Sequence, residues 1–182
     1  MKKIPTIFKR DMNNGGRITQ EYFQEFNFVD AIATEKLDGT NVRVTVRNTE
    51  PVRLEKRRNP DKIQKHKGIT DPWYVDASPY ETGDKWIYDA LKNTDLSNIP
   101  DGEWSGEAVG SDIQGNTLDL ETNRIVFFTL GQCPLFENVP ITYEELKEWL
   151  PKQQSKYGYG LIEGIVWHCV DGSMMKIKTK DF

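Results

Sequence analysis

The sequence contains few of the residues that build disulfide frameworks and metal clusters. Its 182 residues include two cysteines, Cys133 and Cys169, and two histidines, His66 and His168. Two cysteines make neither a disulfide framework nor a zinc site, so we interpret them as reduced thiols of a cytoplasmic protein. No apolar run approaches the roughly 20 residues that span a bilayer. The first five residues also lack the apolar stretch of a secretory signal, so we expect no contact with a membrane.

Aromatic residues and alternating segments predict a folded protein. The chain has five Trp, seven Tyr and eight Phe, enough apolar area to offset the entropy lost on folding. Its length suggests one domain. Residues 42–47 alternate apolar and polar side chains, and residues 52–57 are predicted to return as a second strand. With a strand that ends at Leu37, they predict an antiparallel meander around the turn at Asp38-Gly39.

The remaining pattern predicts more strands and two helices. Residues 84–93 carry apolar side chains at helical spacing, and residues 142–145 form a capping box that opens a short helix ending at Pro151. Residues 59–72 are polar and are expected to form a loop, whereas Asp171-Gly172 predicts a hairpin. Further strands are expected at residues 104–109, 124–130, 163–170 and 173–179. The fold class is therefore predicted to be α+β, dominated by antiparallel strands.

Charge is unevenly distributed along the chain. Residues 43–67 hold nine basic and three acidic side chains, a net charge of +6, so the rest of the chain carries −10. A basic block in an acidic protein suggests a surface for a polyanion, although a solvated strand and loop is the alternative. We predict RNA-backbone contacts from this block, which would be sensitive to salt and blind to sequence. The residues chosen are Arg53, Lys62 and Lys65.

Lysines mark two places where phosphate chemistry is expected. Lys36 ends a predicted strand just before a tight turn, where a neutral lysine amine could serve as a nucleophile. Taken alone, Lys36-Leu37-Asp38-Gly39 fits an ordinary hairpin. Lys176 and Lys178 are two residues apart in a predicted strand, so they project from the same face. Their ammonium groups repel each other unless an anion such as a phosphate lies between them.

Five segments in order resemble the covalent nucleotidyltransferases, which are the ATP-dependent RNA and DNA ligases and the mRNA capping enzymes. Glu-Lys-x-Asp-Gly-Thr-Asn, Gly-Glu-x-x-Gly and Lys-x-Lys look most like the RNA ligases of the smaller bacteriophage type. The five segments are residues 35–41, 106–110, 124–128, 163–167 and 176–178. The resemblance covers residues 34–180. It implies an antiparallel-sheet-rich nucleotidyltransferase domain (an ATP-grasp-like ligase adenylation domain) with a few helices and no OB-fold.

The resemblance assigns the chemistry to a few residues. It makes Lys36 the nucleophile that attacks the α-phosphate of ATP and becomes lysyl-AMP. Lys176 and Lys178 correspond to the pair that grips the α-phosphate and stabilises charge in the transition state. Glu163 corresponds to the acidic ligand of a divalent metal, Mg²⁺ or Mn²⁺.

The resemblance also implies contacts to the nucleotide, several of them with alternatives. Asn41 would place a phosphate or a metal-bound water. Glu35 would read the adenine amino group, or else be an exposed strand charge. The remaining contacts are a ribose or phosphate arginine, Arg57 rather than Arg58; a ribose carboxylate, Glu107 rather than Glu103; and an aromatic residue that stacks on adenine, Phe128 or else Phe127.

Two departures from the family pattern limit the prediction. Many relatives carry a lysine where this chain has His168, which we interpret as an ordinary strand residue. The chain also ends at Phe182, where relatives continue into another module. We therefore expect residues 1–182 to form a single adenylation domain, and a partner could supply the C-terminal module.

The predicted function is an ATP-dependent RNA ligase. It would join a 3′-hydroxyl to a 5′-phosphate, in nicked or single-stranded RNA, through lysyl-AMP and AMP-RNA. A minimal DNA nick ligase and a non-catalytic nucleotide- or nucleic-acid-binding relative are the alternatives, and a capping guanylyltransferase is more distant. Competition between RNA and DNA nicks, and incubation with labelled ATP, would discriminate among them.

Overall fold

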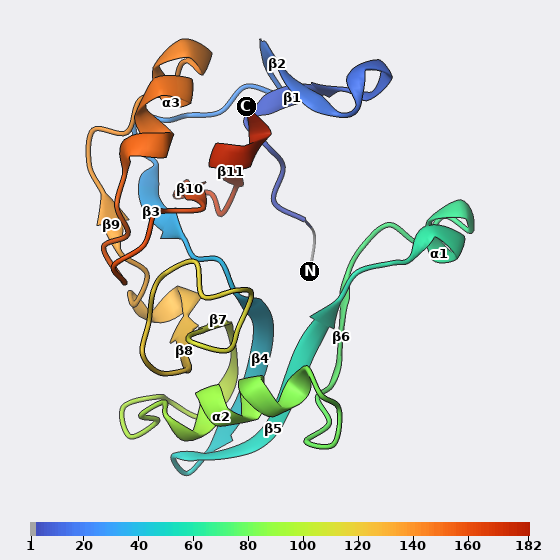
Figure 1. Ribbon diagram of the computed structural model, residues 1–182, viewed down its shortest axis with the longest axis vertical. Helices are drawn as coiled ribbons and strands as arrows, with labels where there is room; N and C mark the ends of the chain where they lie inside the picture. Colours follow the sequence, from blue (N-terminus) through green and yellow to red (C-terminus); the bar gives the residue numbers. More distant parts are fainter. Residues whose placement is uncertain (1–2) are drawn as a thin grey trace. The chain divides into compact units, whose positions relative to one another are not determined.

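A computed structural model describes residues 3–182 of the chain (Figure 1). Two compact units divide these residues. One holds Lys3 and Asp38–Gln132, and the other holds Ile4–Leu37 and Cys133–Phe182. The single adenylation domain expected for residues 1–182 stays a prediction.

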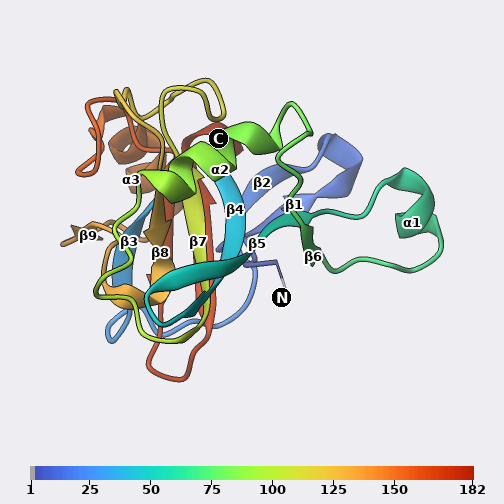
Figure 2. The ribbon, with the colours of Figure 1, turned by 90° about the horizontal axis from the view of Figure 1, so that it is seen from below.

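The unit of residues 38–132 is built on a five-stranded antiparallel sheet in the order β6-β5-β4-β7-β8. Alternation along β4 places Val42, Val44 and Val46 on the face that forms the core, where α2 packs (Figure 2). The opposite face of the sheet is polar. The elements of this unit are β4 (Thr40–Arg47), β5 (Glu50–Arg58), α1 (Lys62–His66), β6 (Trp73–Asp76), α2 (Asp84–Lys92), β7 (Gly102–Val109), β8 (Arg124–Phe127) and the 3₁₀ helix η2 (Phe128–Leu130).

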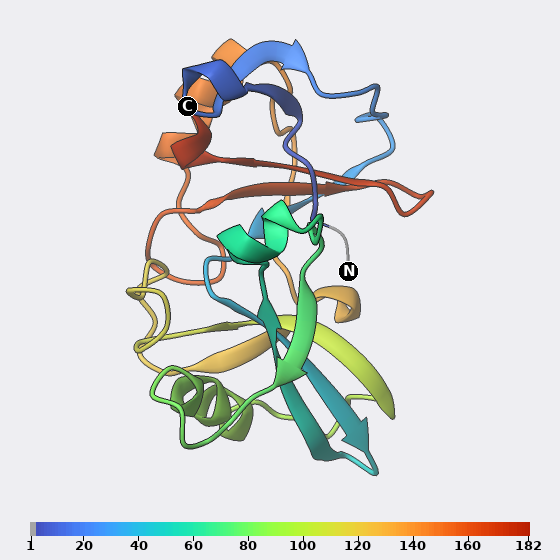
Figure 3. The same cartoon turned by 90° about the vertical axis from the view of Figure 1, so that its right-hand side faces the viewer.

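The other unit contains a four-stranded antiparallel sheet in the order β11-β10-β3-β9, with β10 and β11 side by side (Figure 3). One face of this sheet packs into a core around Trp167, Ile165 and Ile177, which α3 completes with Leu146. Its elements are β1 (Phe8–Asp11), η1 (Met12–Asn14), β2 (Arg17–Tyr22), β3 (Ile32–Lys36), β9 (Leu135–Phe136), α3 (Tyr143–Trp149), η3 (Leu150–Lys152), β10 (Gly164–His168), β11 (Met174–Lys178) and η4 (Thr179–Asp181).

These sheets confirm the α+β class with mostly antiparallel strands, but one predicted connection is wrong. The strand that ends near Leu37 does not pair with the strand that follows Asp38-Gly39, because β3 and β4 belong to different sheets. The turn instead leads the chain from one unit into the other. Gly39 is required there because a Cβ atom would lie 2.2 Å from the backbone oxygen of Ala108 in β7.

Other local differences are small and have local causes. Residues 59–72 contain the short helix α1, because the Asp61 side chain accepts from the Gln64 backbone N–H and the Gln64 side chain accepts from the Asp61 N–H. At α3, the Thr142 hydroxyl donates to Glu145 instead of capping the helix. Among the described residues, no helix has the length and apolar character needed to cross a membrane.

Candidate active site

Strand register brings three charged side chains together in the unit of the four-stranded sheet. Gly164 of β10 lies opposite Lys36 of β3 on one side and opposite Lys178 of β11 on the other. Both lysines bond the carboxylate of Glu163, the residue just before β10. The Lys36 Nζ lies 2.5 Å from Glu163 Oε2, and the Lys178 Nζ donates to Glu163 Oε1. Three predicted site residues are therefore in direct contact.

Gly164 makes this arrangement possible. A Cβ atom at this position would lie 1.9 Å from the backbone oxygen of Ile177, a contact that real side chains essentially never make. Gly164 is therefore required for the close approach of β10 to β11, the strand that carries Lys178.

The two lysines determine the charge state of Glu163. Only 8% of its side chain is exposed, and this burial by itself would raise the pKa of its carboxyl group. The Lys36 charge and the hydrogen bonds from Lys178 and Lys36 outweigh burial, so the pKa of Glu163 lies below its usual range. A carboxylate held between two ammonium groups occupies the place where an anionic ligand would also be attracted.

The same face of this sheet carries the third predicted lysine and the histidine. Lys176 pairs with Val166, two positions along from the Gly164 row, and alternation places it on the face of Lys178. His168 lies on this face too, with its Nε2 3.0 Å from the Thr34 hydroxyl. Burial lowers the pKa of His168, which favours a neutral imidazole where relatives carry a lysine.

Glu35 lies on the opposite face of β3 from Lys36, because successive strand residues alternate. Its side chain is buried, and both carboxylate oxygens are in use. Ser155 Oγ donates to one oxygen at 2.5 Å, and the Lys156 backbone N–H donates to the other at 2.8 Å. Burial raises the pKa of Glu35 despite these bonds. An exposed strand charge, the alternative given for Glu35, is therefore wrong, and its adenine contact stays a prediction.

The polar face of the other unit gathers a second group of predicted residues. Asn41 of β4 pairs with Glu107 of β7, and its Nδ2 lies 3.4 Å from the Glu107 carboxylate. The Tyr74 hydroxyl donates to Asn41 Oδ1 at 2.9 Å and lies 3.1 Å from Ser105 Oγ. These bonds orient the buried Asn41 amide so that its NH₂ group points to Glu107.

The alternatives within this unit differ in their surroundings. Glu103, the rival of Glu107, is exposed and bonds Arg43 at 3.1 Å. Phe127 is fully buried in the core, whereas Phe128 is only partly buried at the start of η2. Arg57 is partly buried and pairs with Tyr74, whereas Arg58 is exposed. A surface ion pair thus uses Glu103 and the core uses Phe127, whereas Arg57 and Arg58 differ in their exposure alone.

Part of the basic block is neutralised by acids. Arg43 makes a two-pronged ion pair with the buried Glu55, at 2.6 and 2.8 Å. Arg53 bonds Asp76 at 2.6 Å and also Glu55 at 3.3 Å. Lys56 bonds Glu81 and Asp84. Arg53 is therefore less available to RNA than its place in the sequence suggests, whereas Lys62 and Lys65 are exposed on α1.

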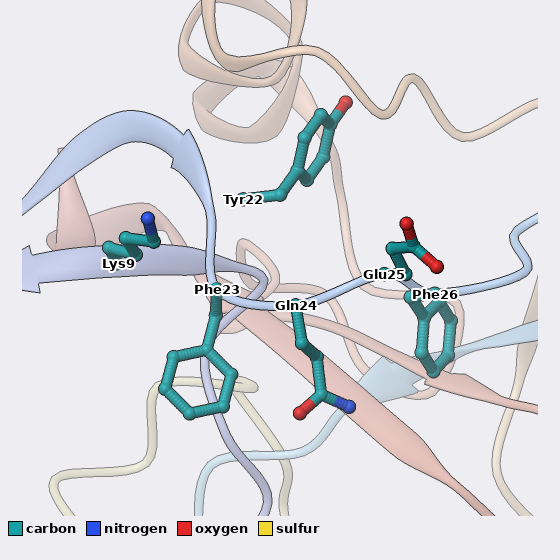
Figure 4. A pocket seen from close by; sticks show the side chains of 6 residues that line it. All are labelled: Lys9, Tyr22, Phe23, Gln24, Glu25 and Phe26. Atoms are coloured by element: carbon teal, nitrogen blue, oxygen red, sulfur yellow. The ribbon is translucent and has the colours of Figure 1, made fainter.

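An open pocket of about 520 Å³ lies beside β2 (Figure 4). Lys9 and residues 22–26 line it. Its lining includes the exposed ring of Phe23 and the side chain of Lys9, which is bonded to Glu21. No residue predicted for the site lines it.

A divalent metal would find a single protein carboxylate in the lysine cluster. Among residues 3–182, no group of three or more His, Cys, Asp or Glu side chains is arranged to hold an ion. Mg²⁺ commonly takes one or two carboxylates and completes its shell with water and substrate phosphates. Glu163 fits that mode of binding, in which the nucleotide supplies further ligands.

Sequence reasoning missed Tyr74 and Ser155. Each donates a hydrogen bond to a predicted site residue. The Tyr74 hydroxyl donates to Asn41, and the Ser155 hydroxyl donates to Glu35. Tyr74 alternates with the partly buried Trp73 and Val75 in a strand-like segment, which could have indicated a sheet-face position. Ser155 lies in an irregular segment, and nothing in its neighbours indicates a contact with Glu35.

The fold is that of RNA ligases. Three solved structures of a Naegleria gruberi RNA ligase match, each at 16% identity over 82% of this chain. A variant with AMP and Mn gives a TM-score of 0.54 over 49% of that chain, a variant with ATP and Mn 0.53 over 50%, and the ligase with PPi 0.52 over 49%. The present chain thus spans about half the length of these proteins. No curated protein matches the chain significantly.

The family is shown by sequence. The family model for RNA ligase 1 matches residues 90–182, just over half of the chain. The chain therefore belongs to the RNA ligase 1 family, and its resemblance to the RNA ligases is confirmed. The matched segment contains Glu107, Phe128, Glu163, Lys176 and Lys178, whereas Lys36 lies outside it.

Proposed function

We propose that this chain is the adenylation domain of an ATP-dependent RNA ligase and that Lys36 carries the AMP. The observation that carries the proposal is the bonding of Lys36 and Lys178 to the single carboxylate of Glu163. Two cations and a carboxylate at one place suit a triphosphate accompanied by a divalent cation. Family membership and the solved Naegleria structures with ATP and Mn support the same assignment.

The first reaction is nucleotidyl transfer to lysine. The Lys36 Nζ attacks the α-phosphorus of ATP, a nitrogen–phosphorus bond forms, and the bond from that phosphorus to the bridging oxygen breaks. Pyrophosphate leaves with the electron pair of that bond. Before the attack Nζ must lose a proton and leave its hydrogen bonds to Glu163 Oε2 and the Leu37 backbone oxygen.

The remaining groups of the cluster have supporting roles. Lys178 and Lys176 would bind the α-phosphate and stabilise the negative charge that builds up on it. A divalent cation, Mg²⁺ or Mn²⁺, would be held by Glu163 together with the phosphate oxygens and would neutralise phosphate charge. By resemblance, Glu107, Arg57, Asn41 and Phe128 bind the ribose, phosphate and adenine, and Glu35 reads the adenine amino group.

Two further steps would follow in sealing. AMP moves from Lys36 to a 5′-phosphate of RNA, and a 3′-hydroxyl then attacks that phosphate and releases AMP. A module outside this chain could assist these steps, because the solved ligases are about twice as long. We propose RNA ends, nicked or single-stranded, as the substrate.

The test is covalent labelling with α-labelled ATP and Mg²⁺ or Mn²⁺, followed by denaturing electrophoresis and mass spectrometry. AMP should be found on Lys36. Lys36→Ala and Lys36→Arg should both abolish it, because a guanidinium stays protonated and cannot attack. The exposed Lys152 provides the control, and Lys152→Ala should be labelled like the wild type. Equal labelling of Lys36→Ala would reject the proposal, and no labelling of the wild type would favour a non-catalytic relative.

The polynucleotide is tested separately. Pre-adenylylated RNA and DNA nicks of the same sequence should be offered together, with sealing followed for each. We expect the RNA nick to be sealed faster. Preference for the DNA nick would replace the RNA ligase with a minimal DNA nick ligase.

A further inference from the structure

The segment between β5 and β6, residues 59–72, extends beyond the ends of both strands (Figures 1 and 2). Pro60 and Pro72 are buried at its base. The helix α1 between them contributes no buried residue, and its side chains therefore add nothing to the core of the unit. Its conformation is held by the capping box of Asp61 and Gln64 and by backbone bonds such as Ile69 N–H to the Gln64 oxygen.

Charge distinguishes this segment from the sheet that carries it. Lys62, Lys65 and Lys67 are exposed, and within residues 3–182 no ion pair to any of them is found. On the sheet, Arg43, Arg53 and Lys56 bond carboxylates, whereas Arg47, Arg57 and Arg58 have no ion pair within residues 3–182. Among the described residues, the segment therefore carries three of the six basic side chains of the block that have no ion pair, and packing does not need these three.

We propose that residues 59–72 contact the phosphate backbone of RNA through Lys62, Lys65 and Lys67. The proposal rests on the proposed function, which supplies an RNA substrate. Lys62 and Lys65 are three residues apart, so they project from neighbouring positions on one side of α1, and Lys67 follows at its C-terminal end. Ammonium groups on long, flexible side chains bind phosphates as point charges, without reading the bases.

Salt dependence gives the proposal a quantitative test. Each phosphate contact on a single strand contributes about 0.7 to the slope of log K against log salt concentration. Three contacts therefore contribute a slope of about 2, which corresponds to an affinity roughly 10²-fold higher at 0.1 M than at 1 M salt. Removing the three charges should take away that part of the slope and of the affinity.

The experiment compares two triple variants of the full chain with the wild type. One is Lys62→Gln, Lys65→Gln and Lys67→Gln. The matched control is Lys92→Gln, Lys147→Gln and Lys152→Gln, which removes three exposed lysines of α2, α3 and η3. Fluorescence anisotropy with a labelled single-stranded RNA is followed across a salt series, and lysyl-AMP formation is measured on the same preparations.

The α1 variant should lose roughly 10²-fold in RNA affinity at 0.1 M salt, with a slope smaller by about 2. The control should bind like the wild type, and lysyl-AMP formation should be unchanged in both. An unchanged salt slope in the α1 variant, or an equal loss of RNA affinity in the control variant, would overturn the inference. Unchanged RNA binding together with an altered oligomeric state would also overturn it and would assign the segment to a protein interface. Failure of the proposed function is distinct, because the wild type would then form no lysyl-AMP whatever its affinity for RNA.

Discussion

Glu163, just before β10, and Glu35 of β3 both have side chains that are largely shielded from solvent, and their surroundings give them opposite properties. Glu163 meets the ammonium groups of Lys36 and Lys178, and its pKa is lowered. Glu35 meets a hydroxyl and a backbone N–H, and burial raises its pKa. Burial acts on both in the same direction, so the partners account for the difference.

The partners also determine what each carboxylate can do. The Lys36 and Lys178 side chains are flexible, and they can exchange Glu163 for a phosphate when a nucleotide arrives. The partners of Glu35 are fixed, because Ser155 also accepts bonds from the backbone N–H groups of Tyr157 and Gly158. We therefore expect Glu163 to matter for chemistry, and Glu35 to stabilise residues 155–158 in addition to the adenine contact proposed for it.

The largest effect should come from Lys178, which bonds Glu163, and from Lys176 on the same face of β11. Lys178→Ala and Lys176→Ala should each slow formation of lysyl-AMP by roughly 10²-fold or more, the usual cost of one preorganised donor to transition-state charge. Lys180→Ala is the matched control, since Lys180 is exposed two residues further along. Single-turnover rates with saturating ATP make the measurement. Rates like the wild type in both variants would mean that these lysines are only solvated.

A smaller effect, on stability, is expected from the loss of the Glu35 carboxylate. Glu35→Ala leaves the Ser155 hydroxyl and the Lys156 N–H without their acceptor, and the free energy of unfolding should fall by about 1–3 kcal/mol. Urea denaturation measures this loss. Glu148→Ala, at an exposed position of α3, should change stability by less than about 0.5 kcal/mol. Equal stability of the two variants would show that Glu35 does not hold residues 155–158.

Local sequence predicted those features that depend on alternation. The shared face of Lys176 and Lys178 follows from their spacing of two residues, and β10, β11 and α2 form where turn signals and apolar spacing predict them. The contact of Lys36 with Glu163 was not foreseen, because it requires the register that sets Gly164 opposite both Lys36 and Lys178. Register between distant strands is a property of the whole sheet.

Two predictions from the sequence were wrong or incomplete because they, too, depend on distant parts of the chain. The meander around Asp38-Gly39 was predicted because neighbouring strands usually pair, yet β3 pairs with β10 and β9 instead. The basic block was counted as free charge, whereas Asp76, Glu81 and Asp84, from outside the block, neutralise part of it. Long-range partners decide both outcomes, and short-range patterns do not contain them.

The smallest effect is a difference in pH dependence between the two carboxylates. The pKa of Glu163 is lowered in the folded protein, so its stabilising contribution is present above the ordinary glutamate value and is lost as the pH falls through the folded value. The pKa of Glu35 is raised, so its contribution is complete below the ordinary value and is lost as the pH rises through the folded value. Acidification therefore weakens the fold through Glu163 and strengthens it through Glu35.

Two variants separate these opposing contributions. With Glu163→Gln, stability should fall less steeply on acidification than in the wild type, because the lost contribution is already absent. With Glu35→Gln, it should fall more steeply, because the compensating gain is absent. Urea midpoints between about pH 3 and pH 7 cover the range in which glutamates titrate, and surface carboxylates such as Asp76 contribute equally to all three proteins. Parallel curves for the two variants would mean that partner chemistry does not separate Glu163 from Glu35.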